Sequence, residues 1–358
     1  MDQSNRPTHG GNLVWAASIA GCPVNQILDF SASINPLGLG SGVISALQQH
    51  LLDVDKYPIP GYLELRQALA QRLQVSPDWI LPGNGAAELL TWAGRELAQH
   101  QTFLPVPAFN DYGRALQAFG APVTKLSLFD PLGNLLDLEQ ILNSSEIPSN
   151  SALLLNNPHN PSGNLWQTQA LLPLLDRFSL VVVDESFMDF VSPSQSLIPW
   201  VEKYDNLVVI SSLTKFYSLP GLRLGYCVAH PDRLARWQSW RDPWVVNRFA
   251  EVAGIAALND QEFIDRTWNW YNSCQPALYE GLQQIPQLRV YPSAANFFLL
   301  RTIKPFTAIQ TELLQEFRLF ARDCLSFPEL GAHYGRVALK SADDNRLLLI
   351  ALDQICAS

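Results

Sequence analysis

From about residue 80, short apolar runs alternate with longer amphipathic segments, and this alternation constrains the fold more than any other feature of the sequence. An apolar run of this length is typical of a buried strand, and the amphipathic segments between the runs are typical of helices. Strands separated by single helices form a parallel sheet with crossover connections. The runs that predict strands are TFLPV from Thr102, ALLLNNP from Ala152, LVVVDES from Leu180, LVVISS from Leu207 and GYCVAH from Gly225.

The two ends of the chain have different patterns. After about residue 260, DRTWNWYNSCQPALYEGLQQI predicts a long helix, and LRVYPSAANFFLLR and YGRVALKS predict antiparallel strands. The beginning of the chain is rich in Gly, Asn and Pro. We therefore predict an α/β protein with an N-terminal arm over residues 1–40 that covers the ligand site, a large domain over 41–255 and a smaller α+β domain over 256–358.

Composition narrows the possible partners. The 358 residues include 24 Lys and Arg and 33 Asp and Glu, which gives a net charge of −9, and the sequence contains no basic block. This argues against a nucleic-acid or anionic-membrane surface. The five cysteines form no CxxC pair, so neither a disulfide framework nor a metal site is indicated. No apolar run approaches the roughly 18 residues of a membrane helix, and the first residues lack the apolar core of a signal peptide, so we expect a cytoplasmic protein.

Several residues follow predicted strands at the ends where a parallel sheet binds ligands. Asp184 ends a very apolar strand, and a carboxylate buried there is costly unless it meets a cation. Phe109 and Asn160 follow two other strands, where one could stack on a flat ring and the other could donate a hydrogen bond. Lys215 follows the next strand along the chain. Desolvation at such a position lowers the pKa of an amine and makes it a nucleophile.

A phosphate site is indicated nearby. The segment LPGNGAAELL predicts a helix that begins at about Ala86, and the free N–H groups from Gly85 to Ala87 suit an anion. Ser212 and Arg223 flank the candidate lysine on either side and could close on the same phosphate.

Together these residues describe a pyridine cofactor that carries a phosphate. Lys215 would attach it covalently, Asp184 would pair with its protonated ring nitrogen, Phe109 would cover the ring and Asn160 would donate to the ring hydroxyl. Taken singly, each residue also has an ordinary explanation, as a surface lysine, a core aromatic or a turn residue. Their order and their placement at strand ends favour the cofactor.

Three motifs support a family resemblance: NPSG from Asn160, DESF from Asp184 and SLTK followed by GLRLG from Ser212. They resemble those of fold type I pyridoxal-phosphate enzymes of the class I/II aminotransferase family, and the resemblance covers nearly the whole chain. Within that family, HGGN from His9, LDFSASINPLG from Leu28 and PWVVN are most similar to L-threonine-O-3-phosphate decarboxylases of cobalamin biosynthesis. Histidinol-phosphate aminotransferases are next.

The resemblance implies pyridoxal 5'-phosphate as cofactor and a homodimer with shared active sites. In such a dimer Tyr57 would reach the cofactor phosphate of the neighbouring subunit. Arg336 matches the arginine that binds the substrate carboxylate, and Arg322 matches a second substrate-facing arginine whose fork suits a phosphate. His9 and Asn35 lie in segments that would cover the substrate.

Two positions depart from the family pattern. Phe187 stands where most aminotransferases carry a tyrosine, as it does in the decarboxylases, so one hydrogen bond to the ring oxygen is missing. Lys340 stands where we expect an arginine in the decarboxylase branch, and a lysine offers charge without a fork.

The resemblance implies decarboxylation of L-threonine O-3-phosphate to (R)-1-amino-2-propanol O-2-phosphate and carbon dioxide. The alternative is transamination of histidinol phosphate or a related amino acid. Both reactions use Lys215, Asp184 and Asn160, so these residues do not distinguish them. A third hypothesis, a ligand-sensing regulator with the same fold, is disfavoured because such regulators carry a DNA-binding domain ahead of the fold, whereas we expect this fold to begin within the first forty residues.

Overall fold

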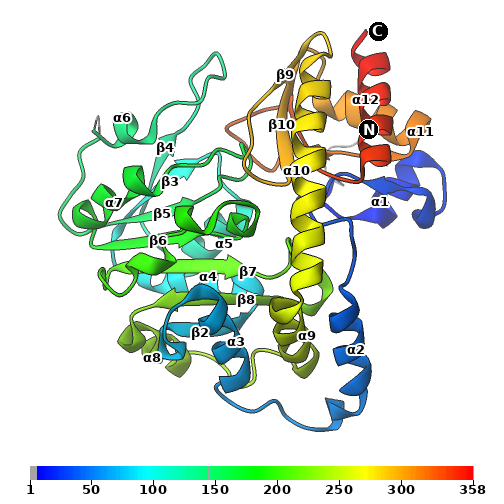
Figure 1. Cartoon of the computed structure of the whole chain (residues 1–358). Coiled ribbons are helices and arrows are strands. Elements are labelled where there is room, and N and C mark those ends of the chain that lie inside the picture. Colours follow the sequence, from blue (N-terminus) through cyan, green and yellow to red (C-terminus); the bar gives the residue numbers. More distant parts are fainter. Residues whose placement is uncertain (1–5, 144, 358) are drawn as a thin grey trace. The chain divides into compact units, whose positions relative to one another are not determined.

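The computed structural model describes residues 6–143 and 145–357 (Figure 1). The chain divides into two compact units: a large unit of residues 37–160 and 165–267, and a small unit drawn from residues 1–36, 161–164 and 268–358. The division into an arm and two domains at residues 40 and 255 remains a prediction. The structure adds that the N-terminal residues fold together with the C-terminal ones.

A seven-stranded sheet forms the centre of the large unit, in the order β2-β8-β7-β6-β5-β3-β4. All five predicted strands are present in it. Six strands run in one direction, but β8 is antiparallel to both of its neighbours, so the expectation of a parallel strand there is wrong. The reason is that only a loop with one short 3-10 turn joins β7 to β8, and a parallel return needs a longer crossover. The strands are β2 (Ile80–Asn84), β3 (Gln101–Val106), β4 (Val123–Ser127), β5 (Ser151–Asn156), β6 (Leu180–Asp184), β7 (Leu207–Ser212) and β8 (Leu224–Ala229).

Helices flank this sheet (Figure 1). Every residue of β5, β6, β7 and β8 is buried, which explains why their sequences are continuous apolar runs rather than alternating ones. The helices of the large unit are α2 (Ser41–Gln49), α3 (Leu63–Leu73), α4 (Gly85–Leu97), α5 (Asn110–Gln117), α6 (Leu138–Asn143), α7 (Thr168–Arg177), α8 (Pro231–Ser239) and α9 (Arg248–Asn259). The chain passes from the large unit to the small one within α10 (Gln261–Gln283).

The small unit contains an antiparallel sheet, as the sequence predicts, in the order β12-β13-β10-β9. A separate parallel pair joins β1 to β11, and helix α1 packs beside α11. The strands are β1 (Leu28–Asp29), β9 (Leu288–Val290), β10 (Phe297–Thr302), β11 (Leu319–Phe320), β12 (Arg322–Asp323) and β13 (Tyr334–Ala338), and the helices are α1 (Leu13–Ala20), α11 (Phe306–Phe317) and α12 (Ala342–Ala357). The predicted N-terminal arm thus contains a helix and a strand that pair with C-terminal elements.

Two general features of the described residues bear on function. None of their helices is long and apolar enough to cross a membrane. In the same part of the chain, no group of three His, Cys, Asp or Glu side chains could hold a metal ion.

Candidate active site

One edge of the large sheet gathers the residues predicted to bind the cofactor. Strands β2, β3, β5, β6 and β7 all end at this edge because they run in the same direction, and the antiparallel β8 begins there. The register places Asn84 opposite Leu224 and Asn156 opposite Asp184. The residues at this edge, or just beyond it along the chain, are Gly85, Ala86, Ala87, Phe109, Asn160, Asp184, Ser212, Lys215 and Arg223.

Asp184 is a buried carboxylate whose two oxygens are both held. The Tyr112 hydroxyl donates to Oδ2 at 2.8 Å, and the Ser186 N–H donates to Oδ1 at 2.9 Å. Burial raises the pKa of Asp184, while these two donors and the charge of Lys215 offset part of the rise. A fixed, desolvated carboxylate of this kind suits a cationic partner such as a protonated ring nitrogen.

Tyr112 is not among the residues that the sequence pattern predicts for the site. It lies in α5, and its ring is completely buried. The only available signal was a phenol within an amphipathic segment, which indicates an inward face but does not reveal which carboxylate the hydroxyl meets.

The beginning of α4 lies close to the Arg223 guanidinium, as the predicted phosphate site requires. Gly85 has φ +73°, and a Cβ at this position would lie 2.6 Å from Nη2 of Arg223. A Cβ on Gly225 would lie 2.6 Å from the Ala86 nitrogen. The two glycines therefore let a guanidinium and a strand approach the first turn of the helix, where the N–H groups of Ala86 and Ala87 have no partner within the helix. The positive helix end and the guanidinium fit a phosphate.

Lys215 lies in the loop directly after β7 and is half-buried. Its charge is close enough to Asp184 to lower the pKa of that carboxyl. The hydroxyls of Ser212 and Thr214 share a hydrogen bond of 2.7 Å, and the Thr214 N–H donates to Ser212 Oγ at 3.3 Å. These bonds shape the turn that precedes the lysine.

Phe109 and Asn160 lie in two loops that a histidine joins. Phe109 is half-buried and packs edge-on against Tyr112, with ring centroids 5.7 Å apart. Asn160 is buried, and its N–H donates to Asn156 Oδ1 at 2.6 Å. His159 Nε2 lies 2.9 Å from the carbonyl oxygen of Pro107. Burial lowers the pKa of His159 to about 4, so the neutral ring donates Nε2–H to that carbonyl and ties the two loops together.

Tyr57 is 79% exposed, unlike the buried and half-buried residues predicted to bind the cofactor ring. Its ring lies 4.6 Å from the Trp244 ring, with an interplanar angle of 33°. Large exposed apolar side chains precede and follow Tyr57 in the sequence, at Leu52 and Ile59 respectively.

The two predicted substrate arginines lie on neighbouring strands of the small unit. Arg322 of β12 and Arg336 of β13 are register partners, and both are buried. Arg322 Nη2 donates to the Thr8 carbonyl at 3.0 Å and to Ser326 Oγ at 2.9 Å. Burial lowers the pKa of Arg336 to about 9, and the neighbouring charge of Arg322 adds to the shift. Two buried cations side by side are costly unless an anion joins them.

The other predicted substrate residues of the small unit differ in exposure. His9 is exposed and Asn35 is buried. Lys340 is half-buried; burial lowers its pKa, and the charges of Asp29 and Asp344 oppose this.

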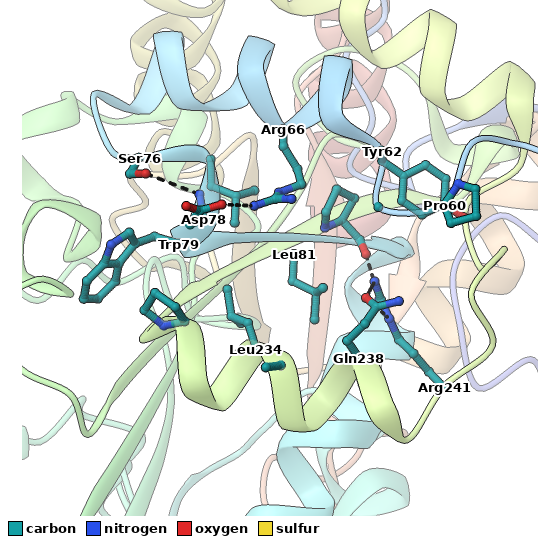
Figure 2. Close-up of a pocket in the computed structure, with 15 residues that line it drawn as sticks. Pro60, Tyr62, Arg66, Ser76, Asp78, Trp79, Leu81, Leu234, Gln238 and Arg241 are labelled. Carbon is teal, nitrogen blue, oxygen red and sulfur yellow. Dashed lines mark hydrogen bonds and ion pairs between the residues drawn. The ribbon is translucent and has the colours of Figure 1, made fainter.

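A pocket of about 660 Å³ lies along the edge strand β2 of the large unit (Figure 2). The Arg66–Asp78 ion pair, with 2.8 Å between Nη2 and Oδ1, lines it, as does Arg241, which donates to the Pro82 carbonyl at 2.7 Å. None of the residues predicted to bind the cofactor lines this pocket, so it is separate from the candidate active site.

Comparison with known proteins identifies the family. Aminotransferase class I and II matches this sequence over residues 26–355. The chain belongs to this family. A threonine-phosphate decarboxylase of Salmonella typhimurium is 38% identical over 97% of this chain and 96% of that protein. Two solved structures are also similar. The histidinol-phosphate aminotransferase of Clostridium acetobutylicum has a TM-score of 0.85 and 27% identity over 92% of this chain and 99% of its own. The L-threonine-O-3-phosphate decarboxylase of Porphyromonas gingivalis has a TM-score of 0.82 and 25% identity over the same shares.

These findings confirm the predicted family and the fold type I α/β architecture of its members. The dependence on pyridoxal phosphate that the resemblance implied is confirmed with them. The roles of the individual residues stay predictions.

Proposed function

We propose that this protein is a pyridoxal-phosphate-dependent decarboxylase that converts L-threonine O-3-phosphate to (R)-1-amino-2-propanol O-2-phosphate and carbon dioxide, as a step of cobalamin biosynthesis. The observation that carries the substrate class is the buried pair of Arg322 and Arg336. A phosphorylated amino acid brings two anionic groups, a carboxylate and a phosphate, to match two cations. Similarity to the Salmonella decarboxylase over nearly the whole chain supports the reaction.

The residues of the large unit would hold the cofactor and support its chemistry. Pyridoxal phosphate, when bound, draws the electrons of a broken bond at the substrate Cα into its ring. Asp184 would keep the ring nitrogen protonated, with Tyr112 and Ser186 fixing its carboxylate. Arg223 and the first turn of α4 would hold the phosphate. Lys215 would carry the cofactor and then return a proton to Cα.

The two arginines would have different tasks. A tight grip on a carboxylate that must leave as neutral carbon dioxide stabilises the ground state more than the transition state. Arg336 would therefore act chiefly by orienting the carboxylate. Arg322, whose fork donates to a carbonyl and a hydroxyl in the structure, would bind the substrate phosphate.

Transamination of histidinol phosphate is the second candidate, and the similarity to the Clostridium structure favours it. One assay separates the two reactions: each substrate is incubated with and without 2-oxoglutarate, and carbon dioxide and glutamate are measured. We expect carbon dioxide from threonine phosphate without any keto acid. If only histidinol phosphate with 2-oxoglutarate reacts, giving glutamate, then the decarboxylase proposal is wrong.

The Arg322→Ala variant should have a KM for threonine phosphate at least ~10-fold higher, because a charge-assisted contact contributes roughly 1.5–3 kcal/mol. Arg336→Ala should lower kcat as well, through lost orientation. Steady-state kinetics on both variants measures this, with Arg346→Ala, an exposed arginine of α12, as the control that leaves both constants unchanged. An unaltered KM in Arg322→Ala would exclude the phosphate role.

We further propose that two copies form a homodimer in which Tyr57 reaches the partner's cofactor phosphate. The support is the exposure of Tyr57 together with the apolar side chains around it in the sequence, Leu51, Leu52, Val54 and Ile59. Light scattering measures the mass directly, and a monomer that retains full activity would exclude shared sites. A cytoplasmic location is proposed as well, since all five cysteines are free thiols.

A further inference from the structure

The ion pair of Arg6 and Asp323 lies beside Arg322, the proposed phosphate-binding arginine, and has no role in the proposed function. Nη1 of Arg6 is 3.1 Å from Oδ2 of Asp323, and the two side chains are only 14% and 8% exposed. The same Arg6 nitrogen donates to Gln310 Oε1, and its guanidinium carbon is 5.7 Å from the centre of the Trp15 ring. Arg6 is therefore held in place by contacts from α1, α11 and β12.

Asp323 is a carboxylate in an unfavourable place for an anion site. It directly follows Arg322 in β12, so the two side chains leave the strand on opposite sides. Its negative charge nevertheless reaches Arg322 and opposes the lowering of the Arg322 pKa by burial. Charges on neighbouring residues interact strongly when both are buried away from water. An unpaired Asp323 would therefore weaken the attraction of Arg322 for a phosphate.

Arg322 donates to two uncharged acceptors, the Thr8 carbonyl and Ser326 Oγ. Among the residues that the structure describes, it forms no ion pair with a carboxylate. Thr8 is two residues from Arg6, so the same short segment forms an ion pair with Asp323 and accepts a hydrogen bond from Arg322. The charge of Arg322 thereby stays available for a ligand.

We propose that Arg6 is a positioning residue for substrate specificity, which neutralises Asp323 and so preserves the affinity of Arg322 for the phosphate group of the substrate. This inference rests on the proposed function. The competing explanation is that the Arg6–Asp323 pair only ties the N-terminal segment down. The two explanations predict different KM values. If the ion pair only anchors the N-terminal segment, removing either partner should raise KM equally. If Arg6 compensates the charge of Asp323, only removal of the arginine should raise KM.

The test compares Arg6→Gln, Arg6→Lys, Asp323→Asn and the double variant Arg6→Gln/Asp323→Asn in the holoenzyme. We expect Arg6→Gln to raise KM for threonine phosphate about 5-fold or more, with kcat within about twofold, since only an electrostatic contribution to binding is lost. Arg6→Lys and Asp323→Asn should keep KM near that of the unaltered protein. The double variant should restore KM to within about twofold, because coupled charges are not additive.

Arg318→Gln is the matched control. Arg318 also links the C-terminal part to the N-terminal segment, through a 2.6 Å bond from Nη1 to Gln26 Oε1, but it has no acidic partner among the described residues. It should leave KM unchanged. A parallel titration with inorganic phosphate by calorimetry should show the same order of affinities without needing turnover.

Two results would overturn the inference. One is a KM in Asp323→Asn raised as much as in Arg6→Gln; the other is a double variant no better than Arg6→Gln. If Arg6→Gln does not fold, Asp323→Asn alone decides, because a raised KM there contradicts charge compensation. Failure of the proposed function is distinct: the unaltered protein would then release no carbon dioxide, while the phosphate titration would still rank the variants.

Discussion

The Lys215→Ala variant should be colourless as purified and should lose activity on the order of 10³-fold. In the proposed function Lys215 has two roles that this variant would lose together: its amine attaches the cofactor, and it is the acid–base group for Cα, which alone contributes typically ~10²–10⁴-fold. The position of Lys215 supports both roles. It lies in the loop after a fully buried strand and is half-buried, and its charge is close enough to Asp184 to lower the pKa of that carboxyl.

Borohydride reduction followed by peptide mass analysis measures the attachment. The unaltered protein should yield a reduced adduct on the peptide that contains Lys215. Lys203→Ala is the control, since its amine lies over the rings of Trp200 and Tyr204, and this variant should remain yellow and active. A reduced adduct that persists in Lys215→Ala would place the cofactor on another lysine.

The sheet, and the edge of it where the predicted cofactor residues lie, were predictable because both depend on patterns within short stretches of sequence. Burial on both faces produces continuous apolar runs, and parallel strands bring residues such as Asp184 and Asn160 to one edge whatever the details of the helices. The direction of β8 was not predictable in this way. Its run, GYCVAH, resembles the others, and only the short loop before it, which ends at Arg223, reverses the chain.

Side-chain partners across the fold were out of reach of the sequence. Tyr112 and Asp184 are 72 residues apart, and Arg6 and Asp323 are 317 apart. Periodicity indicates that a side chain faces inward, but it does not identify the group that it meets. The same limit applies to the pairing of β1 with β11, which makes part of the predicted arm an integral layer of the small unit.

The Asp184→Asn variant should bind the cofactor but turn over ~10²-fold more slowly or worse. An amide keeps the shape of the carboxylate: its oxygen can still accept from the Ser186 N–H, and its nitrogen can donate to the Tyr112 hydroxyl, which rotates to accept. What is lost is the negative charge, and removing one such preorganised electrostatic group costs about 10²–10³-fold in rate. Tyr112→Phe is the graded control, because it retains the charge of Asp184 and removes one donor, and it should lower turnover less than Asp184→Asn.

Cofactor binding is measured by equilibrium dialysis and turnover by carbon dioxide release. Near-normal turnover in Asp184→Asn would show that the ring nitrogen meets a different group.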